Sequence, residues 1–146
     1  MRGRAPGATR DNVGFLLAKA GQRWNELLAE RFAAEGFPEI RPSYGSLLVP
    51  LFEEDGLRMS DLAARARLSK QTMTTMVRLL EREGLARRVP DPADGRATRV
   101  YLTRRSRAFQ PVAERVLSEL DALVETRLSP DGLDRLRAML KGVMSL

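Results

Sequence analysis

Apolar residues recur at three- and four-residue intervals along most of this chain, which is typical of amphipathic helices. The first such pattern predicts a long helix that begins near Asp11 and ends at Gly36. Its apolar stripe comprises Val13, Leu16, Leu17, Ala20, Trp24, Leu27, Leu28 and Phe32. A second helix is expected from Pro42 to about residue 54, because proline suits a first helical turn. Pro50 should kink this helix or end its regular part.

Two short helices are predicted after a turn at Asp55-Gly56. Ser60 should cap the first of them, which runs over residues 61–66, and Ser69 should cap the second. The second helix is expected to extend to Glu83 and to end at Gly84, because glycine adopts the required left-handed conformation at little cost. Its predicted apolar face comprises Met73, Met76, Val77 and Leu80.

A β-hairpin is predicted after these helices. Residues 85–89 can form one strand, and residues 99–103 alternate between apolar and polar side chains as a second strand would. The segment between them, Pro90-Asp-Pro-Ala-Asp-Gly95, is rich in turn-forming residues. Two short helices followed by a charged hairpin make a winged helix-turn-helix.

The rest of the chain reads as helical, with a break at Ser129-Pro130 and a last helix that opens at Pro130. Pro111 is tolerable only near the start of its helix or at a kink. The stripes comprise Phe109, Val112, Val116, Leu120, Leu123, Val124 and Leu128, then Leu133, Leu136, Leu140 and Val143. The terminal helices carry more apolar surface than the winged segment could cover, which indicates a two-fold dimer.

The charge distribution indicates a polyanionic partner. Residues 58–107 carry a net charge of +8, whereas residues 1–57 and residues 108–146 each carry −1. Arginine supplies 22 of the 25 basic residues, and the chain has no cysteine and no histidine. Disulfides, thiolate nucleophiles and Cys/His zinc sites are therefore excluded. A local basic block of this kind favours nucleic acid over an evenly solvated surface.

The second short helix has a face suited to the major groove of DNA, which admits one α-helix. Gln and Arg can bond base edges in bidentate fashion, Thr can offer its hydroxyl or its methyl, and the helix N-terminus suits phosphate. The hairpin tip can enter a minor groove. The candidate DNA-binding residues are Ser69, Lys70, Gln71, Thr72, Thr74, Thr75 and Arg78 on the helix, and Arg88, Arg96 and Arg99 on the hairpin.

These segments resemble the multiple-antibiotic-resistance regulator (MarR) family of winged-helix proteins. The motifs are Met59-Ser-Asp-Leu-Ala-Ala-Arg-Ala66, Leu68-Ser-Lys-Gln-Thr72, Leu79-Leu-Glu-Arg-Glu-Gly-Leu85, Asp91-Pro-Ala-Asp-Gly-Arg96 and Val100-Tyr-Leu-Thr103. The hairpin motif is the most specific, and the resemblance covers nearly the whole chain. Ser106 stands where the family usually has glycine, and the absence of cysteine argues against a peroxide-sensing regulator.

The resemblance implies a homodimer with interlocked terminal helices and a small-molecule pocket between these helices and the winged core. Trp24, Tyr44 and Leu48 could line that pocket, although aromatic residues in a helix stripe are more often plain core. No cofactor and no metal site is expected.

We therefore expect a mainly α protein with a small β-hairpin wing, in which a winged helix-turn-helix core is joined to long terminal dimerisation helices. The expected parts are a mobile basic arm at residues 1–10, an N-terminal dimerisation helix at 11–40, the DNA-binding domain at 41–103 and C-terminal dimerisation helices at 104–146.

The expected function is that of a ligand-responsive repressor that binds an inverted-repeat operator in double-stranded DNA. A cytoplasmic location is expected, because neither a signal-type apolar core nor an apolar run of about 18 residues is present.

Two other functions compete with this expectation. An enzyme would need the acidic clusters at residues 53–55 or at Glu81 and Glu83, but neither has a partner base, a phosphate-cradling loop or metal-ligand spacing. A winged helix that contacts protein or RNA would show no tight duplex binding.

The basic block predicts a steep dependence of duplex binding on salt. Each phosphate that the protein neutralises contributes a slope of about −0.9 to log K against log salt. A dimer that uses several arginines per subunit should give a slope steeper than about −4, measured by titration at several salt concentrations. A flat response would contradict the assignment of residues 58–107 to phosphate contact.

Overall fold

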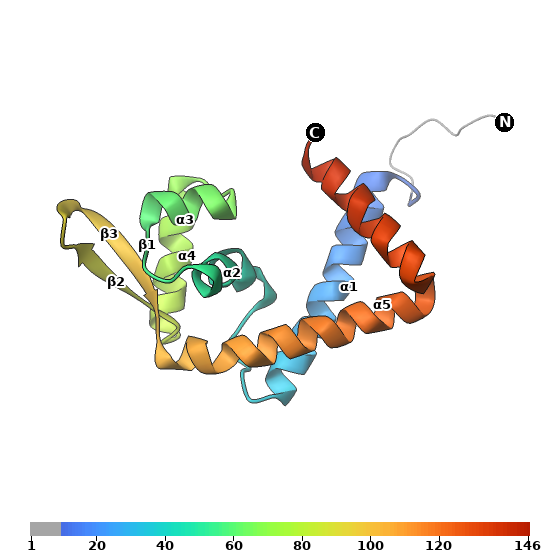
Figure 1. The fold of residues 1–146 in the computed structure, drawn as a ribbon, viewed down its shortest axis with the longest axis horizontal. Coiled ribbons are helices and arrows are strands. Elements are labelled where there is room, and N and C mark those ends of the chain that lie inside the picture. Colours follow the sequence, from blue (N-terminus) through green and yellow to red (C-terminus); the bar gives the residue numbers. More distant parts are fainter. Residues whose placement is uncertain (1–9) are drawn as a thin grey trace.

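The structure is a computed structural model that describes residues 10–146, so the arm predicted at residues 1–10 lies outside the described residues except for Arg10. The elements are α1 (Val13–Ala34), the 3₁₀ helix η1 (Pro42–Tyr44), α2 (Gly45–Glu53), β1 (Leu57–Arg58), α3 (Met59–Ala66), α4 (Lys70–Arg82), β2 (Ala86–Asp91), β3 (Asp94–Leu102) and α5 (Arg104–Met144). Figure 1 shows a winged lobe of α2, α3, α4 and the strands, joined by the first part of α5 to a lobe that holds α1 and the end of α5.

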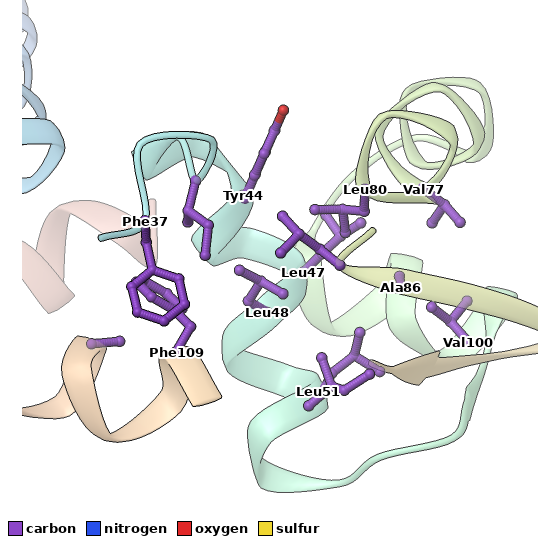
Figure 2. Packing of buried hydrophobic residues seen from close by; sticks show 14 of the residues in the cluster. Phe37, Tyr44, Leu47, Leu48, Leu51, Val77, Leu80, Ala86, Val100 and Phe109 are labelled. Atoms are coloured by element: carbon purple, nitrogen blue, oxygen red, sulfur yellow. The ribbon is translucent and has the colours of Figure 1, made fainter. Parts of the chain in front are cut away.

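Helix α2 forms the centre of the core. Leu47, Leu48 and Leu51 are all buried (Figure 2). The first turn, which holds Pro42, is 3₁₀ rather than α-helical. Pro50 lies inside α2 and the helix continues to Glu53, so the proline does not end it at that point.

An aromatic cluster joins α5 to α1 and α2. The ring of Phe109 lies 4.7 Å from that of Phe32 in an edge-to-face arrangement, 5.1 Å from Phe37 and 6.5 Å from Phe52, measured between centroids. Figure 2 shows Phe37 and Phe109 side by side next to Leu48. Edge-to-face aromatic pairs add stabilisation beyond the area they bury.

Three helix boundaries predicted from the sequence are confirmed. The Ser69 hydroxyl accepts a hydrogen bond from the Thr72 N–H at 3.2 Å and caps α4. Gly84 follows α4 with φ +73°, the left-handed conformation expected of it. Ser129 interrupts α5 with φ 72° and ψ 163°, and Pro130 follows the break. Pro111 lies early in α5, which continues through it.

The cap predicted at Ser60 is wrong, because α3 begins at Met59, two residues before the predicted start at residue 61. The residue at the cap position is Arg58, which makes no capping side-chain bond. The reason is strand β1, which pairs with β3 through Leu57 opposite Val100 and leads the chain directly into α3.

The hairpin is longer than the sequence predicts, and β1 makes it a three-stranded antiparallel sheet in the order β1-β3-β2. Strand β2 reaches Asp91 and β3 begins at Asp94, so the turn is confined to Pro92 and Ala93 instead of filling residues 90–95. Pro90 fits in β2 because this strand lies at the sheet edge, beside a register irregularity where a missing N–H is tolerated.

The start of α5 is locked to the end of α4. Thr103 caps α5 by accepting from the Ser106 N–H at 3.3 Å, and its hydroxyl donates to the Gly84 carbonyl at 2.6 Å. Ser106, the departure from the family pattern, is fully buried and its hydroxyl donates to the Leu85 carbonyl. The added hydroxyl therefore has a partner, and the fold accommodates it.

The apolar stripes of the terminal helices are only partly covered. Leu28 and Phe32 of α1 are buried, whereas a set of large apolar side chains at the start of α1 and along the second half of α5 is exposed. The set comprises Val13, Phe15, Leu16, Leu17, Leu123, Leu128, Met139, Leu140, Val143 and Met144. None of the helices within residues 10–146 combines the length and the apolar character that a membrane span needs.

The aromatic cluster predicts that Phe109→Ala lowers the free energy of unfolding by about 3–5 kcal/mol, because it leaves a cavity among three other rings. Chemical denaturation followed by circular dichroism measures this change. Phe109→Leu should cost clearly less, since it retains part of the buried volume. Equal losses for the two variants would contradict the role assigned to the ring.

Candidate nucleic-acid interface

One face of α4 is anchored in the core and the opposite face is free. Met73, Val77 and Leu80 are buried, and Met76 is half-buried. Figure 2 shows Val77 and Leu80 among the buried side chains of the winged lobe. This anchoring fixes the rotation of α4 about its axis and so determines which residues face outward.

The outward face carries three polar side chains that are exposed: Lys70, Gln71 and Arg78. Within residues 10–146, none of these three side chains takes part in a hydrogen bond or an ion pair. Thr75 is also exposed, and Thr74 is half-buried. Long side chains without partners can reach a ligand without first breaking an internal bond.

Ser69 and Thr72 are engaged in the start of α4. In addition to the cap, the Ser69 hydroxyl donates to the Thr72 hydroxyl oxygen at 2.9 Å. These two candidate residues therefore shape the helix N-terminus, where free N–H groups and the helix dipole favour an anion.

The three candidate arginines of the hairpin have different surroundings. Arg96 is exposed beside the wing turn, and its backbone N–H donates to Asp94 Oδ1 at 3.0 Å. The guanidinium of Arg96 has no ion pair among the described residues. Arg88 is paired through Nε with Glu81 at 2.8 Å. Of these three candidate arginines, only Arg96 has a guanidinium without an ion pair among the described residues.

Arg99 is held at the base of the wing. Its Nε lies 3.2 Å from Asp91 Oδ2, and its Nη1 donates to the Gly56 carbonyl at 2.8 Å. The two bonds tie β3 to the end of β2 and to the turn before β1. In this position Arg99 supports the wing instead of extending from it.

Asp91 is the buried centre of this arrangement, and its role was missed from the sequence. The residue is 3% exposed, and its carboxylate accepts from the Ala93 N–H at 2.9 Å and from Arg58 Nε at 2.7 Å. The bond from Ala93, together with Arg58 and Arg99, lowers the pKa of Asp91 below its usual value. The pairing of Arg58 with Asp91 could not be predicted, because nothing in residues 57–58 indicates a strand. The pairing of Asp91 with an arginine of the wing had one signal in the sequence, the spacing of Asp and Arg in the hairpin motif.

The residues proposed for a ligand pocket do not converge. Leu48 lines a small apolar cavity of about 110 Å³ bounded by α1, α2 and α5, together with Phe32, Phe52 and Phe109. Tyr44 is buried and Trp24 is half-buried against the core, and neither lines this cavity. A larger open groove of about 720 Å³ runs along α1 and is bounded by Pro42 and Ser43. No cluster of three or more metal-ligating side chains exists in residues 10–146.

Comparison with known proteins identifies the family. Residues 41–98 match the sequence profile of the MarR family. An HTH-type transcriptional repressor of Mycobacterium tuberculosis is 34% identical over 129 residues, which cover 88% of this chain and 91% of that protein. The chain belongs to the MarR family of transcription regulators. TtmR, an HTH-type transcriptional regulator of Methylorubrum extorquens, is 33% identical over 107 residues, but the chain spans only 51% of its length.

Solved structures confirm the predicted fold class. A probable transcriptional regulator from Pseudomonas aeruginosa is 28% identical and superimposes with a TM-score of 0.79 over 91% of this chain and 97% of that chain. The transcriptional repressor CouR, solved bound to a 23-mer DNA duplex, has the same fold with a TM-score of 0.79 at 23% identity, over 98% of this chain and 99% of that chain. The fold is the winged helix-turn-helix of this MarR family with its long terminal helices.

The wing base predicts a specific effect of pH. Because the pKa of Asp91 is lowered in the folded chain, its contribution to stability is complete above the unfolded pKa of about 3.9 and is lost as pH falls through the lowered value. Asp91→Asn should lower the denaturation midpoint at pH 7, and the gap to wild type should shrink as pH falls below about 4.

Asp94→Asn is the matched control, because Asp94 is exposed and its side chain, within residues 10–146, accepts a hydrogen bond from the Arg96 N–H alone. It should leave the midpoint close to wild type at every pH. A gap between Asp91→Asn and wild type that stays constant down to pH 2 would contradict the assigned role.

Proposed function

We propose that this MarR-family chain is a repressor that binds an inverted repeat in duplex DNA as a homodimer. The observation that carries the proposal is the free outward face of α4 together with the free guanidinium of Arg96 near the wing turn. Lys70, Gln71 and Arg78 are exposed, and their side chains make no bond among the described residues, whereas Arg88 is paired with Glu81 and Arg99 shares Asp91 with Arg58.

The ion pairs support this selection among the basic residues of the winged segment. Of the thirteen basic residues in positions 58–107, six are paired with carboxylates: Arg58, Arg65, Arg88, Arg99, Arg105 and Arg107. The remaining seven, which include Lys70, Arg78 and Arg96, have no ion pair among the described residues and are the most direct candidates for phosphate contact. In this proposal Gln71, Thr75 and Arg78 read bases, Lys70 and the helix start bind phosphate, and Arg96 enters the minor groove.

The exposed apolar surface supports the dimer. Leu16 at the start of α1 is 49% exposed, and Leu123 and Leu140 on α5 are 49% and 38% exposed. Exposed apolar patches of this kind mark association surfaces. A two-fold partner would cover them and place two copies of α4 about 34–36 Å apart, one turn of DNA.

Control by a small molecule is the least direct part of the proposal. The cavity beside Leu48 lies where α1, α2 and α5 meet, but its volume of about 110 Å³ is below the roughly 300–1,000 Å³ of drug-sized ligand pockets. A ligand there would have to be very small or separate Phe52 from Phe109. Of the three pocket residues expected from the sequence, only Leu48 stays in the proposal.

Selection from a pool of randomised duplexes tests whether the protein binds a specific DNA sequence. Footprinting of the recovered duplexes then shows the half-sites, and light scattering of the free protein gives its mass. We expect an inverted repeat with half-site centres 10–10.5 base pairs apart and a dimer mass at micromolar concentration. A monomer that protects single half-sites would refute the symmetric assembly, and failure to retain any duplex would favour a protein or RNA partner.

The assigned roles predict distinct effects of substitution. Gln71→Ala and Arg78→Ala should each cost about 1–3 kcal/mol on the selected duplex and relax specificity at one position, whereas Arg96→Ala should weaken all sequences alike. Arg88→Ala is the matched control, because Arg88 is paired with Glu81, and it should change affinity by less than about twofold. Unchanged operator preference in both the Gln71 and the Arg78 variant would exclude α4 as the reading helix.

A further inference from the structure

Two threonines on α4 have their hydroxyl groups turned back onto the helix. Thr75 Oγ1 donates to the Gln71 carbonyl at 3.1 Å, and Thr74 Oγ1 donates to the Lys70 carbonyl at 2.9 Å. Thr74 is half-buried, but Thr75 is exposed on the outward face. The side chain of a threonine in a helix is stiff, and this back-bond selects one of its two rotamers.

The bond determines what Thr75 can offer to a base. A hydroxyl has one hydrogen, and that of Thr75 is used by the backbone. Most of the hydrogen-bonding groups on the major-groove edges are acceptors: guanine N7 and O6, adenine N7 and thymine O4. Thr75 cannot donate to them without breaking its own bond. Its γ-methyl makes no bond, and its oxygen can still accept only from the two donors of the groove, adenine N6 and cytosine N4.

The only apolar group on the floor of the major groove is the C5-methyl of thymine. We propose that Thr75 is a specificity-determining residue that recognises one thymine in each half-site by contact between its γ-methyl and this C5-methyl. The inference rests on the proposed function, since it assigns the partner group of one residue on the reading face.

The neighbours of Thr75 place this thymine in the half-site. Gln71 lies four residues before Thr75 and Arg78 three residues after it, so the three share one face of the helix. The amide of Gln71 suits adenine and the guanidinium of Arg78 suits guanine. The thymine read by Thr75 therefore lies between the base pairs that these two residues contact.

The test combines two protein variants with one chemical change in DNA. The probe is the tightest duplex recovered from the randomised pool. In each version of it, one thymine position is replaced by deoxyuridine in both half-sites, and the versions together cover every thymine of the half-site. Thr75→Val keeps a methyl and loses the hydroxyl, whereas Thr75→Ala loses both. The two variants alter an exposed side chain, and valine and threonine have similar helix propensities.

We expect Thr75→Val to bind within about twofold of wild type, because the group that touches DNA is retained. Loss of one buried methyl contact corresponds to about fourfold in affinity per half-site, so Thr75→Ala should bind roughly fifteenfold more weakly as a dimer. Deoxyuridine at one thymine position should weaken wild type by the same factor. It should leave Thr75→Ala unaffected, because the contact is already absent.

Three results would overturn the inference. Thr75→Val as weak as Thr75→Ala would show that the hydroxyl makes the contact. If wild type were insensitive to deoxyuridine at every thymine, no thymine methyl would be contacted. If deoxyuridine weakened wild type and Thr75→Ala equally, the thymine methyl would be contacted by a residue other than Thr75. In all three cases the duplex is still bound, so the proposed function stands; failure to bind any duplex would overturn both.

Discussion

The burial of one broad face of α2 is the constraint on which the rest of the structure depends. Leu47, Leu48 and Leu51 lie on this face and are each at most 1% exposed, whereas Val49 on another side of the helix is 45% exposed. Figure 2 shows Leu48 beside Phe109, and Leu47 toward Leu80 of α4. An apolar helix face of this kind must be covered by other elements. The buried face of α2 therefore lies in the same core cluster as the buried face of the reading helix and the ring of Phe109.

The elements that local chemistry specifies could be predicted from the sequence. Ser69, Gly84 and the Ser129-Pro130 break each act through bonds or backbone angles within a few residues, and each was found where expected. Strand β1 could not be predicted, because two residues show no periodicity and the pairing partner, Val100, is far along the chain. The wrong cap at Ser60 follows from the same omission.

The candidate site shows the same division between local and distant effects. Which residues face outward on α4 follows from the helical period, and the buried positions of Met73, Val77 and Leu80 agree with it. Which arginines are free does not follow from spacing alone. Arg88 and Arg99 look like Arg96 in the sequence, but the sheet brings Glu81 to one and Asp91 with the Gly56 carbonyl to the other. Likewise, the apolar pattern of the helices made Trp24, Tyr44 and Leu48 equal candidates for a pocket. It does not show that, of these three, only Leu48 lines the cavity.

The part of α5 before the break at Ser129 is long enough that a small tilt at one end causes a large displacement at the other. Residues 104–128 span about 37 Å at a rise of 1.5 Å per residue. A tilt of about 5° at one end of such a rod displaces the other end by about 3 Å, which is close to the 3.4 Å between successive base pairs along one strand. A tilt of that size where α5 crosses α1 would therefore displace the winged lobe by about one base-pair step.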